Sequence, residues 1–177
     1  MKKELFVHFS FLISFLILTS LIKGWFNLSY WPLWLGGVVG TLLPDIDHLI
    51  YIFLLRPYEL TSQRATHLLS EKEVVRTLEL LAETRQERKD LIFHTLLFQI
   101  IFLILTFWVV TSSGNIFGRG LVLAFSFHLV IDQVVDLMET GGLTNWFKNV
   151  PFSLDKEKSI YYCSVLLFLV LIFGIIL

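Results

Sequence analysis

The distribution of apolar residues is the feature that most restricts the fold of this 177-residue chain. Apolar runs long enough to cross the hydrocarbon core of a bilayer alternate with polar connections. Hydrophobic residues make up 55% of the chain and charged residues 16%, whereas soluble domains carry about 25% charge. We therefore predict a single all-α domain over residues 1–177, a polytopic membrane bundle. Its transmembrane helices, about five, are expected at residues 5–22, 32–55, 91–110, 121–137 and 160–177.

The first apolar run follows Lys2 and Lys3, as a signal peptide would. However, no Ala-x-Ala-like cleavage site follows it, so we expect an uncleaved first helix. In the second run, Pro44 should break the helix and free backbone groups near Gly40. Gly36 and Gly40 are four residues apart, a spacing that lets another helix approach closely.

Residues 56–90 differ from the rest because they carry seven basic side chains. Within them, Ser70-x-x-Glu73 is typical of a capping box at the start of a helix. We predict a cytoplasmic amphipathic helix that lies on the membrane or beneath the bundle. Its apolar face would consist of Val74, Leu78 and Leu81.

The basic residues also predict the orientation. With five crossings and a cytoplasmic N-terminus, twelve of the fourteen Lys and Arg residues are cytoplasmic, and only Lys23 and Arg119 are external. This bias predicts a prokaryotic inner-membrane protein with an external C-terminus. The net charge of −1 offers no basic face for nucleic acid, so the expected partner is the lipid bilayer. The single Cys163 excludes an internal disulfide and a multi-cysteine zinc site, and the oligomeric state stays open.

The same topology brings the intramembrane ionisable groups to one depth, near the cytoplasmic side. Such groups are costly in a bilayer and are therefore functional candidates. They come from four of the spans, and they are His8, Asp45, Asp47, His48, His94, His128, Asp132 and Asp136.

Imidazole and carboxylate groups in one layer indicate a divalent-metal site, with zinc expected first and Mn²⁺ or Fe²⁺ as alternatives. His128 and Asp132 are four residues apart and share one helix face, so they can chelate one ion. Asp45 and Asp47 are two residues apart at the break caused by Pro44, so their side chains need not point the same way. One could ligate while the other orients a histidine or acts as a general base, and either could instead cap the following helix. We take both as catalytic candidates.

The remaining polar residues have weaker assignments. Asp136 lies one turn beyond Asp132 and is expected to cap or to support a ligand. His48 need not point inward, and His67 is expected to be solvated. Arg88 and Lys89, just before His94, could attract a substrate phosphate or simply anchor the helix in the membrane.

Four motifs resemble those of a known family. They are His8 in the first span, Gly40-x-x-Leu-Pro-Asp-x-Asp-His48, Phe93-His-Thr-Leu-Leu97 and Phe127-His-Leu-x-x-Asp132. Together they resemble the YdjM-type membrane-bound metal-dependent hydrolases, which are thought to be distantly similar to zinc-dependent phospholipase C and zinc-dependent single-strand nucleases. That resemblance implies metal ligands at His8, Asp45, His94, His128 and Asp132.

One motif departs from the family pattern. Many members carry His-Arg-Gly-x-Thr-His-Ser at the third element, whereas residues 89–93 here contain no histidine before His94. Gln63-Arg-Ala-Thr-His67 partly resembles that block. Either His67 folds back as a ligand, or the site has fewer ligands.

We expect a membrane-embedded metal-dependent hydrolase with a cytoplasm-facing His/Asp site, acting on a phosphoester or lipid-like substrate such as a phospholipid. Two alternatives use the same residues. A transporter or proton relay would need polar groups through the full depth of the bundle, which the sequence does not supply. A non-catalytic, metal-stabilised scaffold would have a closed site with four protein ligands.

Overall fold

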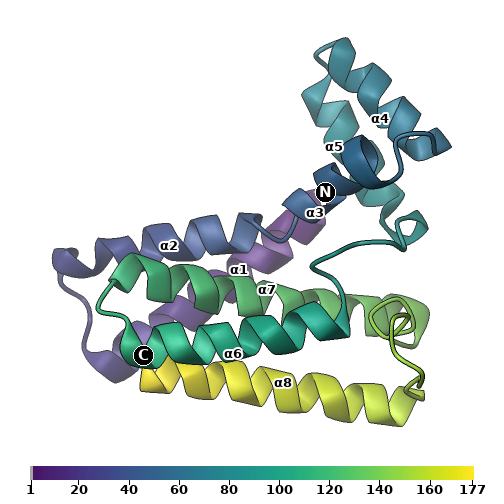
Figure 1. The fold of residues 1–177 in the computed structure, drawn as a ribbon. Coiled ribbons are helices and arrows are strands. Elements are labelled where there is room, and N and C mark those ends of the chain that lie inside the picture. The colour runs from purple at the N-terminus through teal and green to yellow at the C-terminus, as the bar shows by residue number, and fades with distance from the viewer. Residues whose placement is uncertain (1) are drawn as a thin grey trace.

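The computed structural model describes the backbone of residues 2–177 and the side chains from Phe6 onward. It confirms the all-α prediction, because the described chain is helical and contains no strand. The long helices lie side by side (Figure 1), and they are α1 (Lys2–Lys23), α2 (Trp31–Leu42), α6 (Leu96–Ser112), α7 (Ile116–Thr140) and α8 (Lys156–Ile176). The shorter elements are η1 (Leu28–Tyr30), α3 (Ile46–Ile50), η2 (Tyr51–Leu55), α4 (Leu60–Ser70), α5 (Val74–Glu83) and η3 (Arg85–Glu87).

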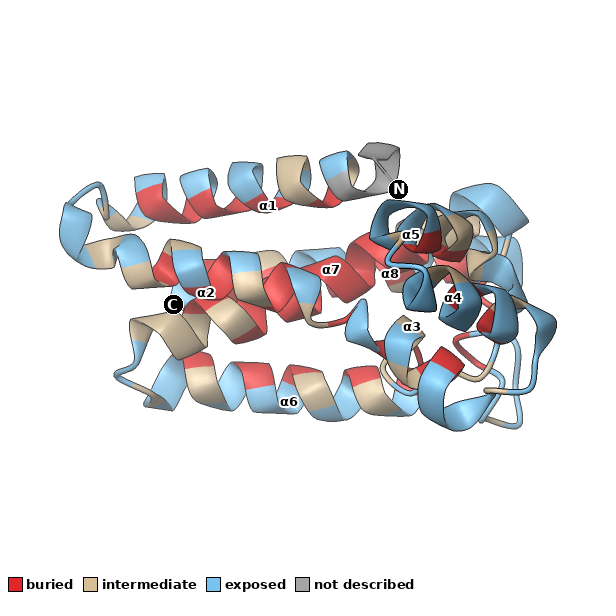
Figure 2. Cartoon of the chain, turned by 90° about the horizontal axis from the view of Figure 1, so that it is seen from above, coloured by how far each residue is buried: buried red, intermediate tan, exposed pale blue. Residues whose placement is uncertain are grey.

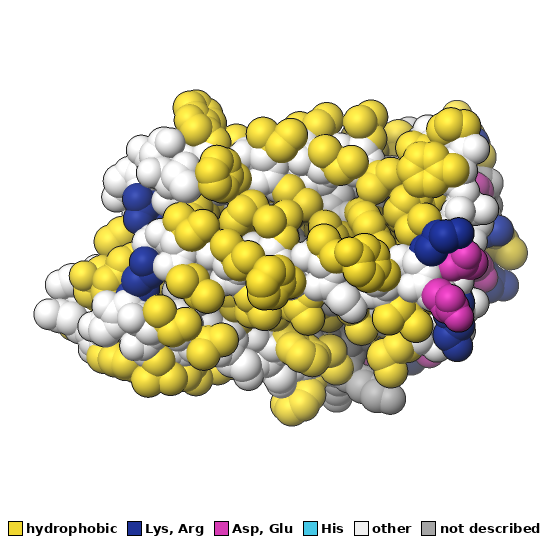
Figure 3. Space-filling view, turned by 90° about the horizontal axis from the view of Figure 1, so that it is seen from below, with side chains coloured by type: hydrophobic (Ala, Val, Ile, Leu, Met, Phe, Trp, Pro, Cys, Tyr) yellow, Lys and Arg dark blue, Asp and Glu magenta, His cyan; other side chains and the backbone are white. Residues whose placement is uncertain are grey.

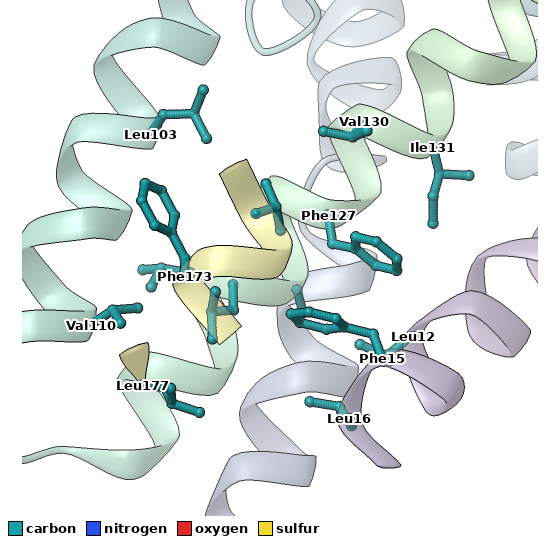
Figure 4. Close-up of a cluster of buried hydrophobic side chains, with 14 of the residues drawn as sticks. Leu12, Phe15, Leu16, Leu103, Val110, Phe127, Val130, Ile131, Phe173 and Leu177 are labelled. Atoms are coloured by element: carbon teal, nitrogen blue, oxygen red, sulfur yellow. The ribbon is translucent and has the colours of Figure 1, made fainter. Parts of the chain in front are cut away.

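Helix α7 is the centre of the bundle and contacts α1, α2, α6 and α8. Its residues from Gly120 to Gln133 are almost all buried. The largest cluster of buried apolar side chains forms around it (Figure 4), where the Phe15 and Phe127 rings stack with centroids 4.7 Å apart. The helix that carries His128 and Asp132 is therefore the one held most firmly by its neighbours.

Four helical segments are long and apolar enough to cross a membrane, and they are Phe6–Lys23, Leu28–Leu55, Ile116–Thr140 and Lys156–Ile176. The predicted third span begins at Leu96 rather than at residue 91. The resulting helix, α6, is apolar and has 17 residues, about 25 Å of length. It packs against α7 and α8, so it belongs to the same bundle.

Large apolar side chains cover the outer surface of the bundle (Figure 3), while acidic side chains on that face gather at one end. The inward faces of the helices are buried along their length (Figure 2). Such a surface is stable in contact with lipid. The start of α1 and the end of α8 lie at opposite ends of the bundle (Figure 1). The side chains of Lys2 and Lys3, used in the orientation argument, lie outside the described residues.

Helices α2 and α7 approach closely because both carry glycine, which confirms the role predicted for Gly36 and Gly40. A Cβ atom on Gly36 would lie 2.1 Å from the carbonyl oxygen of Phe117, and one on Gly40 would lie 2.2 Å from that of Leu121. Gly120 of α7 makes the reciprocal approach to α2. This contact positions the turn at Pro44 against α7.

The predicted amphipathic helix is present as α5, with Leu81 buried, and the segment also forms an earlier helix, α4, that was not predicted. Both helices project from one end of the bundle (Figure 1). The expected capping box does not form, since Ser70 ends α4 and donates its hydroxyl to the carbonyl of His67. Lys72 then adopts a left-handed φ of 61°, which turns the chain before α5 begins.

Candidate metal centre

Asp132 lies at the centre of a buried cluster of three histidines. Its Oδ1 is 3.0 Å from Nε2 of His8. Its Oδ2 is 2.8 Å from Nε2 of His94 and 3.2 Å from Nε2 of His128. All four side chains are buried. The structure thus brings together four of the five residues predicted as ligands.

Two helices position most of this cluster. His128 and Asp132 are one turn apart on α7, so both face the same side. His8 reaches them from α1, and its ring stacks on that of His128 with centroids 4.2 Å apart. The two rings are held against each other by the packing of α1 on α7.

His94 was expected in the first turn of a helix, but it lies in the non-helical segment that precedes α6. The reason is a contact from a distant part of the chain. The Asp47 carboxylate accepts hydrogen bonds from the backbone N–H groups of Ile92 and Phe93, at 3.0 and 2.6 Å. Helix α6 begins only after Thr95, whose hydroxyl caps the N–H of Phe98.

Asp47 also lies 3.0 Å from Nδ1 of His94, and its side chain is completely buried. With Nδ1–H donating to Asp47, the other ring nitrogen of His94 points at Asp132. Carboxylates often orient metal-binding histidines in this way. This geometry fits a positioning role for Asp47 better than the catalytic role predicted for it.

Asp45 occupies the N-cap position of α3, yet its side chain makes no capping hydrogen bond. Its Oδ1 lies 3.7 Å from Nε2 of His128, and half of its side chain is exposed. Asp45 therefore lies at the edge of the cluster, where a small molecule can reach it.

Arg85 is a member of the site that the sequence did not reveal. Its Nη2 lies 2.9 Å from Oδ1 of Asp132 and 3.4 Å from Oδ1 of Asp136. The short η3 turn after α5 directs it into the bundle, while nothing in the sequence distinguishes it from the other basic residues nearby. Asp136 also accepts a hydrogen bond from Nε1 of Trp146 at 2.7 Å, so it supports the cluster from outside.

Arg88, predicted either to attract a substrate phosphate or to anchor the helix, makes several structural contacts. It is buried and donates to the carbonyl and hydroxyl groups of Thr84, at 3.3 and 3.0 Å, and to Nδ1 of His48 at 3.1 Å. It also donates to the carbonyl of Leu81. These contacts join the end of α5 to α3. Lys89 is exposed and lines a cavity beside the cluster.

The two remaining histidines are not alike. His48 lies next to the cluster, with its ring 5.4 Å from that of His94 between centroids. His67 is exposed on α4 and lies 3.7 Å from Glu71, so it does not fold back into the site. The alternative in which His67 acts as a ligand is therefore absent, which leaves the alternative of a site with fewer ligands.

The cluster has the donors that a divalent cation requires. Ligand atoms of His8, His128 and Asp132 all lie within 4.8 Å of one another. Nδ1 of the buried His128 has no hydrogen-bond partner among the described residues, and Nε2 has the Asp132 carboxylate at 3.2 Å. Burial of such a group is costly, and a cation would satisfy it. Two histidines and one carboxylate also leave coordination positions open, which is typical of catalytic metal sites.

Two cavities reach the cluster. The larger, about 360 Å³, lies between α3 and α5 and is lined by His8 and Asp45 among others. The smaller, about 190 Å³, lies beside η3 and the segment 140–146, and His94 and Asp136 line it. Both cavities are lined by Arg85 and Arg88.

The fold and the site define a class: a helical membrane protein with buried His and Asp side chains gathered at one end of its bundle. The comparison with protein families is more specific. The chain belongs to the YdjM inner membrane protein family, whose model matches residues 5–176. No curated protein and no solved structure gave a match.

Proposed function

We propose that this protein is a metal-dependent hydrolase of the inner membrane that acts on a phosphoester or lipid-like substrate. The observation that carries the proposal is the convergence of ligand atoms of the buried His8, His128 and Asp132 within 4.8 Å of one another. His94, oriented by Asp47, adds a further nitrogen beside Asp132. Zinc suits this donor set, and Mn²⁺ or Fe²⁺ are alternatives.

A bound divalent metal would supply a water with a pKa of about 7 and would polarise a phosphoryl oxygen. The protein supplies the rest of the chemistry. Asp45 is placed to accept the proton of the attacking water, because it borders His128 and is half exposed. Arg85 brings a positive charge next to Asp132, where negative charge would develop on a phosphoryl group.

A transporter or proton relay is less well supported by the structure. The polar side chains farther along the bundle are amides and hydroxyls that satisfy one another. Gln99 and Gln133 exchange two hydrogen bonds of 3.1 and 2.8 Å, and the Tyr162 hydroxyl donates to Gln99 at 2.6 Å. This set bonds α6, α7 and α8 together and contains no carboxylate or imidazole for a relay.

The test is turnover by the purified, metal-loaded protein on phosphodiester, phospholipid and carboxylic ester substrates. We expect hydrolysis that a chelator abolishes and that added metal restores. The Asp45→Asn variant should keep its metal and lose most of its activity, commonly by about 10²–10⁴-fold for a general base. His67→Ala is the control and should be fully active. Metal-loaded protein with no chelator-sensitive turnover on any of these substrates would refute the proposal.

A further inference from the structure

The two cavities have different lining residues, but Arg85 and Arg88 line both of them. In the larger cavity, the residues near the surface are the apolar Leu42, Ile46, Leu49 and Leu78. All four are partly exposed and so continue the apolar outer surface of the bundle. The rest of its lining includes the buried His8 and Leu81 and the polar Asp45 and His48.

The smaller cavity has more polar side chains in its lining, beside the apolar Leu91, Leu143 and Trp146. It contains the side chains of Gln86, Lys89, Thr140, Thr144 and Asn145. Its one carboxylate, that of Asp136, is already bonded to Trp146 and paired with Arg85. This cavity is suited to a neutral or anionic group rich in hydroxyls.

Asp132 and its histidines lie between these two spaces. His8 lines the larger cavity and His94 lines the smaller one, and Nε2 of each lies within 3.0 Å of the Asp132 carboxylate. Arg85 lines both and lies 2.9 Å from the same carboxylate. A ligand that occupied both cavities would therefore pass Arg85 and lie beside His8 and His94.

We infer that the site binds a lipid phosphodiester, with its acyl chains in the larger cavity, its phosphate at Arg85 and its polar alcohol in the smaller cavity. This inference rests on the proposed function and narrows its substrate class. A lipid phosphomonoester would leave the smaller cavity without a ligand group. A water-soluble phosphodiester would leave the apolar rim of the larger cavity uncovered.

The test measures equilibrium binding to the full chain in maltoside detergent, with a chelator present so that no hydrolysis intervenes. The ligands are phosphatidylglycerol, phosphatidic acid with the same acyl chains, and glycerophosphoglycerol. Leu78→Trp narrows the larger cavity, and Gly142→Trp fills the smaller one, since a Cβ at Gly142 makes only an ordinary contact with Thr144. The matched controls are Val75→Trp on the same helix α5 and Gly114→Trp at the far end of the bundle, where a Cβ meets nothing within 4 Å.

We expect each cavity variant to weaken phosphatidylglycerol binding about tenfold, a loss near 1.4 kcal/mol. Phosphatidic acid should be weakened by Leu78→Trp alone, and glycerophosphoglycerol by Gly142→Trp alone. If Gly142→Trp weakens phosphatidic acid as much as phosphatidylglycerol, or weakens neither, the inference is wrong. The proposed function fails separately, through loss of chelator-sensitive turnover.

Discussion

The carboxylate of Asp47 is completely buried. Hydrogen bonds from the backbone N–H groups of Ile92 and Phe93 offset the cost of burying it. The Asp47→Asn variant replaces one accepting oxygen by an amide that cannot accept these hydrogen bonds. We expect the free energy of unfolding to fall by about 1–3 kcal/mol. Metal affinity should also fall, by about 10–100-fold, because His94 loses its orienting partner.

Thermal unfolding in detergent, followed by tryptophan fluorescence, measures the first effect, and metal titration measures the second. Glu71→Gln, at an exposed position just after α4, is the control. An Asp47→Asn protein with the stability and the metal affinity of the wild type would contradict the role given to this carboxylate.

Asp90 makes the stability depend on pH. The Lys148 ammonium and the Arg56 guanidinium, which donates to it at 3.0 and 2.5 Å, hold the pKa of this carboxyl below its usual range. Because the pKa is lower in the folded state, the stabilisation is present above the unfolded pKa of about 3.9. It is lost as the pH falls through the folded value.

We therefore expect Asp90→Asn to lower the unfolding midpoint at pH 7, with the difference from wild type disappearing in strong acid. The Lys148→Ala variant should be destabilised at pH 7 and should not add its full effect to that of Asp90→Asn. Thermal scans across the pH range measure both. A difference between Asp90→Asn and wild type that stays constant down to strong acid would contradict this assignment.

Among the elements, the contact between α2 and α7 positions Asp45 beside His128 and Asp47 beside His94. The methyl group of a Gly40→Ala variant would collide with the backbone of Leu121. We expect a destabilisation of about 1–3 kcal/mol from overpacking, together with weaker metal binding. Gly118→Ala, on α7 itself, is the matched control because its Cβ would make only ordinary contacts. Equal unfolding midpoints for the two variants would contradict the close approach.

The elements also show how far the sequence alone could predict this site. The convergence of His8, His94, His128 and Asp132 followed from spans and helical spacing, both of which are local properties. The position of His94 in a non-helical segment did not follow, because it depends on Asp47, which lies far away in the chain. Arg85 was missed for a similar reason. The direction of its side chain is set by the η3 turn and not by any periodic pattern.

For the whole molecule, the orientation in the membrane is still a prediction. The start of α1 and the end of α8 lie at opposite ends of the bundle (Figure 1), and the positive-inside bias assigns the N-terminal end to the cytoplasm. We expect alkaline phosphatase fused after Leu177 to be active, since that enzyme requires an external location. A fusion within the α4–α5 connection should be inactive. The reverse result would place the site on the external face.

The most direct test of the metal centre is elemental analysis of the purified protein. We predict that wild type and His67→Ala each retain a divalent metal, zinc first, and that His128→Ala loses it. The two substitutions remove the same side chain, one from the buried cluster and one from an exposed helix. Folded His128→Ala protein with the full metal content of wild type, or wild type that binds no divalent metal when it is supplied, would contradict a metal site at His8, His128 and Asp132.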